Sequence, residues 1–262
     1  MPVERVDEVS RYYHPVAQIE KAKIALFWVV AVLSLLILQA GPFFEAGVQE
    51  LGRVAFIVLG LTFFVLAMAN RFYFIPRAER RRRRQLLSDA FRTSLSHDRT
   101  TLYYNNEFPP SLQRLAASTM ENALFSKEIA GEMLGAKRLV IGGYLLVWLV
   151  AFTLRHADLN LLIWITQVVF SAELVAGWIS LEVLRARHEA TYEELHRHFL
   201  HAVGDRSASA IATVLEAFAS YEVTKAATGV QLSSKVFARL NPGLTARWET
   251  IRKDLGMRED PD

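Results

Sequence analysis

The chain has 262 residues, of which 52% are hydrophobic and 22% are charged, and its formal net charge is +3. It contains no cysteine, which excludes a disulfide framework, thiolate catalysis and a cysteine metal site. A globular domain could have the same average composition, so the distribution of the apolar residues along the chain is more informative than their number.

The apolar residues gather into four runs, each close to the roughly 20 residues that cross the hydrocarbon core of a bilayer. The runs are 24–40, 54–75, 139–154 and 159–184. Their only charges are Arg71, Glu173 and Glu182. A cleaved signal peptide is the alternative for the first run, but the long preceding segment carries both signs of charge, which favours a retained helix. The sequence therefore predicts an all-α, polytopic membrane protein with four transmembrane helices.

Lysine and arginine flank these runs on one side only. The two short connections, 41–53 and 155–158, hold only Arg53 and Arg155. Because positively charged residues remain in the cytoplasm, we expect both termini to be cytoplasmic. The predicted organisation is an N-terminal part with two membrane helices, a cytoplasmic helical insert, a second pair of membrane helices and a C-terminal cytoplasmic helical region. Their ranges are 1–75, 76–138, 139–184 and 185–262.

The cytoplasmic segments show helical periodicity. Pro76 is expected to end the second membrane helix, and 77–95 is expected to form a helix with a basic first half. The pattern breaks over 98–108, and Pro109-Pro110 suits the start of the next helix. From Ser111 onward no strong helix breaker precedes the third apolar run.

The fourth run likewise continues as helix through Val203. An apolar stripe after Gly204 predicts another helix, and Asn241-Pro242 suits the start of a final helix that extends to Leu255. The stripe consists of Ile211, Val214, Leu215, Phe218 and Tyr221. No convincing alternating strand pattern is present, and the insert and the tail are expected to pack together.

The most polar feature is the run of arginines Arg80–Arg84. It could bind an anionic lipid or a nucleotide. The simpler interpretation is a topological clamp beside the lipid headgroups, where each cation contributes about 1 kcal/mol near an anionic surface.

The most unusual feature is the string formed by Tyr103, Tyr104, Asn105, Asn106 and Glu107. Aromatic side chains stack on nucleobases, and asparagine pairs with an adenine edge. Arginine binds phosphate through two hydrogen bonds, and Arg92 and Arg99 are nearby in the sequence. The alternative is an ordinary turn, because asparagine tolerates left-handed geometry.

Glu173 falls in the middle of the fourth run. An ionisable group there costs about 2.5–3.5 kcal/mol on insertion scales, so it is expected to face protein or water. Thr166, Phe170, Gly177 and Ser180 share its side of a helix. This side could line a pore or could be a packing seam between helices.

A histidine-rich stretch lies in the tail. Its members are His188, His196, His198 and His201, with Glu193 and Glu194. A metal site is the less favoured interpretation because all candidate ligands come from one helix, and a solvated or pH-sensitive helix face is favoured. No motif of a known catalytic class is present, so we do not expect an enzyme, and no cofactor or metal is indicated.

Three sequence segments resemble the SMODS-associated four-transmembrane effector family. They are Leu86–Phe91 continuing through Thr93–Leu95, Tyr103–Glu107, and Leu240–Leu244 with Trp248-Glu249. The resemblance spans nearly the whole chain and implies four membrane helices with a helical cytoplasmic part.

This resemblance also implies a function in bacterial anti-phage defence. A partner nucleotidyltransferase would make a cyclic di- or trinucleotide after infection. The effector would bind this cyclic oligonucleotide, self-associate in the inner membrane and permeabilise it, which kills the infected cell. A membrane scaffold and a small transporter or channel remain the alternatives.

Overall fold

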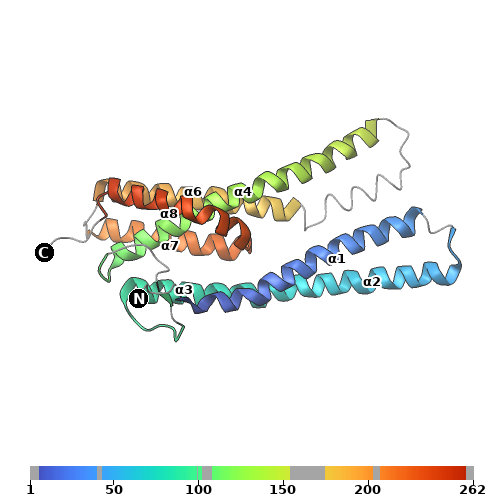
Figure 1. The fold of residues 1–262 in the computed structure, drawn as a ribbon, viewed down its shortest axis with the longest axis horizontal. Coiled ribbons are helices and arrows are strands. Elements are labelled where there is room, and N and C mark those ends of the chain that lie inside the picture. The colour runs from blue at the N-terminus through green and yellow to red at the C-terminus, as the bar shows by residue number, and fades with distance from the viewer. Residues whose placement is uncertain are drawn as a thin grey trace. The chain divides into compact units, whose positions relative to one another are not determined.

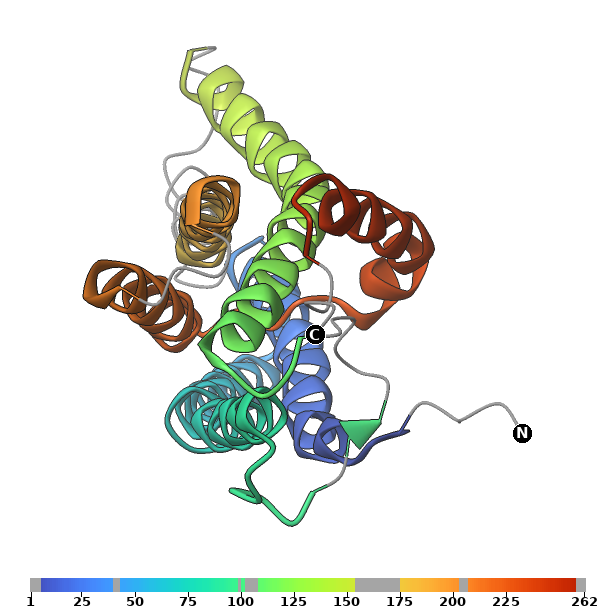
Figure 2. The same ribbon diagram turned by 90° about the vertical axis from the view of Figure 1, so that its left-hand side faces the viewer.

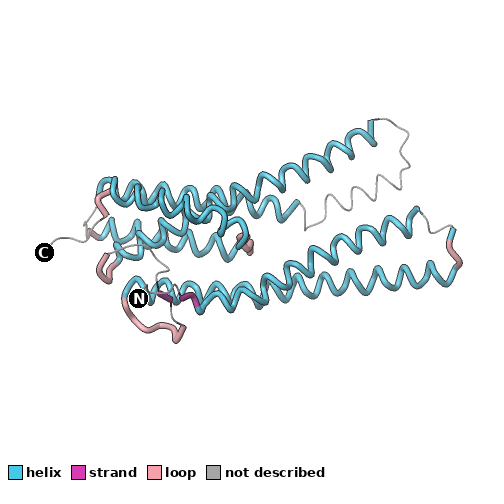
Figure 3. The backbone as a smooth tube through the Cα atoms, in the orientation of Figure 1, coloured by secondary structure: helices cyan, strands magenta, loops and turns pink. Residues whose placement is uncertain are grey.

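The computed structural model describes residues 6–39, 43–98, 100–101, 108–153, 175–202 and 207–257. Within these residues the fold is all-α, with six helices when the continuous helix Ala46–Phe91 is counted once. Nearly all of the described backbone in Figure 3 is helical. The exception to the helical pattern is a pair of two-residue strands, β1 (Val6–Asp7) and β2 (Thr100–Thr101), which the sequence analysis did not predict.

The chain divides into two compact units. The bundle unit comprises Met1–Tyr12, Arg77–Gly135 and Ile179–Asp262, and the hairpin unit comprises Tyr13–Pro76 and Ala136–Trp178. Each unit is therefore assembled from segments that are far apart in the sequence.

In the hairpin unit, α1 (Tyr13–Gln39) and α2 (Ala46–Ala69) lie side by side as two antiparallel helices (Figure 1). A polar contact joins them near one end, where the Asn70 side-chain amide donates to the Glu20 carboxylate at 2.6 Å. Lys23 binds the same carboxylate at 3.1 Å. Asn70 is almost completely buried, so this contact fixes the register of the two helices.

Pro76 does not end the second helix, contrary to the sequence-based prediction. The helix continues through the π-helical turn η3 (Asn70–Phe74) into α3 (Ile75–Phe91). The backbone N–H of Ile75 bonds to the carbonyl of Asn70, five residues earlier. Such a wide turn immediately before a proline relieves the usual conflict between its ring and the preceding turn. The predicted helix 77–95 also ends earlier, at Phe91.

The helix α4 (Leu112–Thr153) is 42 residues long and belongs to both units. This confirms the prediction that no break separates the insert helix from the third apolar run. The helix α6 (Gly177–Ala202) similarly confirms that the fourth run continues as helix beyond residue 179.

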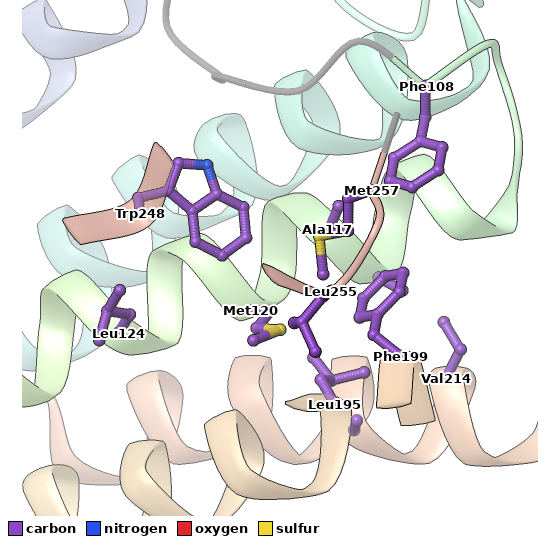
Figure 4. Close-up of a cluster of buried hydrophobic side chains, with 12 residues drawn as sticks. Phe108, Ala117, Met120, Leu124, Leu195, Phe199, Val214, Trp248, Leu255 and Met257 are labelled. Atoms are coloured by element: carbon purple, nitrogen blue, oxygen red, sulfur yellow. The ribbon is translucent and has the colours of Figure 1, made fainter. Parts of the chain in front are cut away.

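The core of the bundle unit lies where α4 meets α6, α7 (Ala208–Thr228) and α8 (Ser234–Asp254). In Figure 2, α4 runs between α8 on one side and α6 with α7 on the other. Figure 4 shows Met120 of α4 near Leu195 of α6, with Leu124 of α4, Phe199 of α6 and Trp248 of α8 in the same cluster. The insert and the tail thus pack together, as the sequence predicted.

Two details of the tail differ from the prediction. Helix α8 begins at Ser234, because the Ser233 hydroxyl caps it by accepting from the Val236 amide at 3.4 Å, and Pro242 lies inside the helix. The stripe predicted for α7 is only partly buried: Ile211 and Leu215 are exposed on its outer side.

Among the described residues, one helix is long and apolar enough to cross a membrane, and it is Ala46–Phe91. None of its most apolar window is buried.

Candidate functional site

Most of the predicted ligand-binding residues lie outside the described residues, namely Arg99, Tyr103, Tyr104, Asn105 and Asn106. The same holds for Thr166 and Glu173 of the predicted pore side. Of the remaining predicted residues, Gly177 begins α6 and Ser180 follows one turn later, half-buried. The candidate site is therefore defined by the residues that hold the two ends of the segment between α3 and α4.

Arg92 follows the end of α3 with an exposed side chain and a φ of 48°. The Thr93 amide donates to the Ser88 carbonyl at 3.1 Å, so Arg92 occupies the left-handed position that often ends a helix. Its immediate structural role is to reverse the chain direction, and its guanidinium is directed toward solvent and available to a ligand.

A bidentate ion pair joins the first turn of α4 to the last turn of α3. The Arg114 guanidinium contacts both oxygens of Asp89 at 3.0–3.1 Å. Arg114 also donates to the Phe108 carbonyl at 2.8 Å, and the Phe108 ring stacks on Phe199 with a centroid distance of 6.2 Å. This end of the segment is therefore anchored both electrostatically and in the apolar core.

A second set of contacts anchors the segment at Asp98, whose side chain is only 3% exposed. Arg11 binds its carboxylate at 2.6 Å, and Arg81 lies 3.8 Å away. Both guanidinium groups also lie about 5 Å from the Tyr12 ring centroid.

The antiparallel pairing of β1 with β2 adjoins this anchor, with Val6 opposite Thr101. The Gln85 side chain donates to the Thr100 hydroxyl at 2.7 Å. The predicted ligand residues Tyr103–Asn106 are therefore preceded and followed in the sequence by well-anchored residues.

The arginine run is only partly a solvent-facing feature. Arg82 forms a bidentate pair with Asp7 at 2.8 and 3.0 Å, and Arg83 lies 3.9 Å from Glu222 of α7. The guanidinium groups of Arg80 and Arg84 are the ones with no ion-pair partner among the described residues. Much of the run therefore stabilises the bundle, a role that the sequence analysis did not consider.

A buried polar network joins α3, α6 and α7. His188 of α6 is 1% exposed, and its ring lies 4.7 Å from that of Tyr221. Burial, assisted by the Lys225 charge, lowers the pKa of His188 to about 3, and burial raises the pKa of Tyr221 to about 12.

The acidic members of this network lie around Lys225 of α7. Its ammonium contacts Glu79 of α3 and lies 3.4 Å from Glu222. Burial raises the pKa of Glu222, while the Lys225 charge opposes the shift. The network therefore carries several partly compensated charges inside the bundle.

The histidine stretch is not one solvated face, so this part of the favoured interpretation is wrong, whereas its pH sensitivity stays a prediction. His188 and His198 are buried, whereas His201 is exposed. Within the described residues, no group of three histidine, aspartate or glutamate side chains could hold a metal ion. These histidines differ in burial because successive residues of a helix point in different directions, so that some face the core and others face solvent.

A cavity between α4, α6 and α8 also lies in the bundle unit, and the sequence analysis did not detect it. Its charged lining residues come from α4 and α6, which are far apart in the sequence, and α8 contributes Leu240 and Leu244. No local spacing could have indicated this convergence.

The comparisons with known proteins add no relative: no family model, curated protein or solved structure matches the chain.

Proposed function

We propose that the chain is a multi-pass membrane effector that binds a cyclic oligonucleotide with its helical bundle and then permeabilises the bacterial inner membrane. The observation that carries this proposal is the contrast between the two units. The bundle unit buries an apolar core, whereas helices of the hairpin unit expose large apolar side chains.

The exposed apolar residues follow each helix over several turns. They are Ile24, Trp28, Val29, Val32 and Leu36 of α1; Leu51, Val54, Ile57, Leu61, Phe64 and Val65 of α2; and Leu139, Leu146 and Leu149 of α4. An aqueous surface rarely carries so extensive an apolar area, and lipid satisfies it. This supports membrane helices at 24–40, 54–75 and 139–154, with 159–184 as the fourth by composition.

The ligand proposal rests on the resemblance and on the anchoring of the described residues that flank 102–107. The aromatic and amide side chains of Tyr103–Asn106 are suited to stacking on a base and pairing with its edge. A ligand drives a conformational change only through tighter binding to one state, and a shift from 1:99 to 99:1 requires about 5.5 kcal/mol. A multivalent anion that contacts several subunits supplies such a difference.

The test is dye release from liposomes that contain the full chain. We expect leakage with one member of a panel of cyclic di- and trinucleotides and none without it. The double variant Tyr103→Ala/Asn106→Ala should abolish binding and leakage while leaving membrane insertion intact. Glu173→Gln should alter leakage without altering binding. Liposomes that stay sealed with the entire panel would refute the ligand-gated effector.

The proposed topology has a separate test in sealed inverted vesicles, whose outer surface corresponds to the cytoplasm. Protease added outside should cut within the segment 76–138, and cleavage restricted to right-side-out vesicles would reverse the proposed orientation.

A scaffold that recruits another protein is the second candidate. It is favoured by the outer side of α7, where Ile211, Leu215 and Val223 are exposed. This candidate predicts a constant protein partner and no response to small molecules in the liposome assay.

A further inference from the structure

A cavity of about 410 Å³ lies between α4, α6 and α8 in the bundle unit. It is lined by Lys127, Glu128, Gly131, Glu132, Arg185, Glu189, Leu240 and Leu244. Its volume falls in the range of small-molecule sites. Because most lining side chains are charged, the cavity is better suited to a polar or charged ligand than to an apolar one.

Two cations at this cavity share one carboxylate at distances too long for hydrogen bonds. The Lys127 ammonium lies 3.6 Å from Glu189, and the Arg185 guanidinium lies 3.8 Å from the same side chain. Among the described residues neither side chain has a closer acceptor. The Lys127 side chain is only 11% exposed, so its ammonium is largely removed from water without a full set of acceptors, which is unfavourable.

The other two acidic residues of the cavity are already neutralised by α8. Glu128 accepts from Arg247 at 2.8 Å, and Glu132 accepts from Arg239 at 2.5 Å. Their charges are therefore engaged at the rim, and they do not compensate Lys127 and Arg185. The local charge balance consequently favours an anion.

The surroundings of Lys127 and Arg185 leave space for a ligand. Gly131 lies beside Arg185, and a Cβ at this position would be 3.6 Å from the Arg185 Nε. Glycine thus leaves the guanidinium accessible. Tyr192 lies next to the cavity with its ring centroid 4.6 Å from the Lys127 ammonium, which provides an aromatic surface beside the cations.

We propose that this cavity binds a phosphate group, with its oxygens bridging Lys127 and Arg185 in place of Glu189. Phosphate offers several acceptor oxygens, which matches two cations that both lack close acceptors. The ligand class rests on the proposed function, in which a phosphodiester of the cyclic oligonucleotide occupies the cavity. A phospholipid headgroup has the same chemistry, and the experiment separates these two sources.

This position gives the ligand a direct connection to the membrane segments. Helix α4 continues into the third apolar run, and α6 begins within the fourth. A phosphate bound to Lys127 and Arg185 therefore contacts both helices at once. Replacing Glu189 on Lys127 and Arg185 changes the electrostatic link between the two helices.

The test uses the full chain in detergent micelles and measures binding of tripolyphosphate and of the same panel of cyclic di- and trinucleotides by calorimetry. We expect Lys127→Met and Arg185→Gln each to weaken tripolyphosphate binding by roughly tenfold or more. Arg187→Gln and Lys235→Met are the controls, because they remove an exposed charge from α6 and α8 and should leave affinity unchanged. Circular dichroism verifies that each variant is folded.

Glu189→Gln distinguishes a ligand site from a purely structural ion pair. Removal of the competing carboxylate should strengthen tripolyphosphate binding severalfold, whereas a structural role predicts lower stability and no gain in affinity. Tripolyphosphate binding that is indifferent to Lys127→Met and Glu189→Gln, or absent altogether, overturns the proposal.

The remaining measurements distinguish a nucleotide from a lipid headgroup as the source of the phosphate. They also distinguish failure of the cavity proposal from failure of the proposed function. Displacement of bound tripolyphosphate by soluble glycerophosphoglycerol, the headgroup of phosphatidylglycerol, but not by cyclic nucleotides assigns the cavity to a lipid headgroup. Tripolyphosphate binding without binding of any cyclic nucleotide supports the cavity and refutes the nucleotide-gated effector. Cyclic nucleotide binding that survives Lys127→Met supports the effector and removes the cavity as its site.

Discussion

Arg114, in the first turn of α4, holds Asp89, near the end of α3, through both carboxylate oxygens. The Ser111 amide also donates to the Ala90 carbonyl at 3.1 Å. The ends of α3 and α4 are thereby joined directly, and the segment between them is closed into a loop. This loop carries the residues proposed to contact the nucleotide base.

Arg114→Ala should destabilise the bundle by about 2 kcal/mol, because it leaves the half-buried Asp89 carboxylate without its bidentate partner and removes the donor to Phe108. The measurement is urea unfolding of the full chain in micelles, followed by circular dichroism. Hydrogen exchange of the Ser111 amide, which donates to the Ala90 carbonyl, should accelerate in the same variant.

Arg247→Ala is the control for this prediction, since its ion pair with Glu128 is about half exposed. Solvent screens such a pair, and its loss should cost less than about 1 kcal/mol. Equal losses in the two variants would show that the Arg114 contact is an ordinary surface pair.

Arg92→Gly should stabilise the protein by about 0.5–1 kcal/mol. A residue with a side chain is strained at a φ of 48°, and glycine relieves this strain at some cost in unfolded-state entropy. Thermal unfolding provides the measurement. The same substitution at Arg84, which is exposed inside α3, should instead destabilise by about 1 kcal/mol.

The Arg92→Gly variant also separates the two roles of this residue. If the guanidinium contacts the nucleotide, affinity falls although stability rises. If Arg92 only ends the helix, the variant binds as well as the wild type, and Arg92 is removed from the proposed site.

His188 should make the bundle less stable in mild acid. Its pKa is lowered to about 3 in the folded state by burial and by the Lys225 charge, against about 6.5 in the unfolded chain. The unfolded state therefore binds a proton that the folded state does not. This contribution to the free energy of unfolding is fully present above pH 6.5 and is lost as the pH falls toward 3. The loss amounts to about 2 kcal/mol by pH 5.

The variant His188→Phe tests this pH dependence, because the ring stays packed near Tyr221 and no longer titrates. Urea unfolding between pH 7.5 and 5 should show a smaller loss of stability than in the wild type. The raised pKa of Glu222 acts in the opposite direction and is common to both proteins. His201→Gln, at an exposed position, is the control, and an equal change in both variants would exclude His188 as the source.

The long-range features of the fold could be predicted where a sequence pattern is continuous. The absence of a strong breaker between Ser111 and the third apolar run predicted a single helix, and α4 is continuous through Thr153. The periodic apolar residues of the tail likewise predicted its helices, and its packing against the insert was predicted because both segments were expected on the same side of the membrane. These features depend on local periodicity, which is visible in one sequence.

Other features depend on partners that are distant in the sequence. Pro76 stops a helix in most contexts, but the π turn at Asn70, buried against Glu20, carries the helix past it. The arginine run matches a topological signal, yet Arg82 binds Asp7, which lies 75 residues away. The cavity proposed to bind phosphate likewise combines Lys127 and Arg185 from separate helices.

The start of α8 offers a final test of how local signals compete. Asn241-Pro242 is a plausible helix start, but Ser233 caps the helix earlier and Pro242 remains exposed inside it. Pro242→Ala restores a backbone donor and removes the ring clash, so it should stabilise the protein by about 1–3 kcal/mol in urea unfolding. Pro242→Gln is a second variant with the same expected effect, because glutamine, like alanine, is a good helix former. A helix that truly began at Pro242 would lose stability in both variants, because proline favours the first helical position.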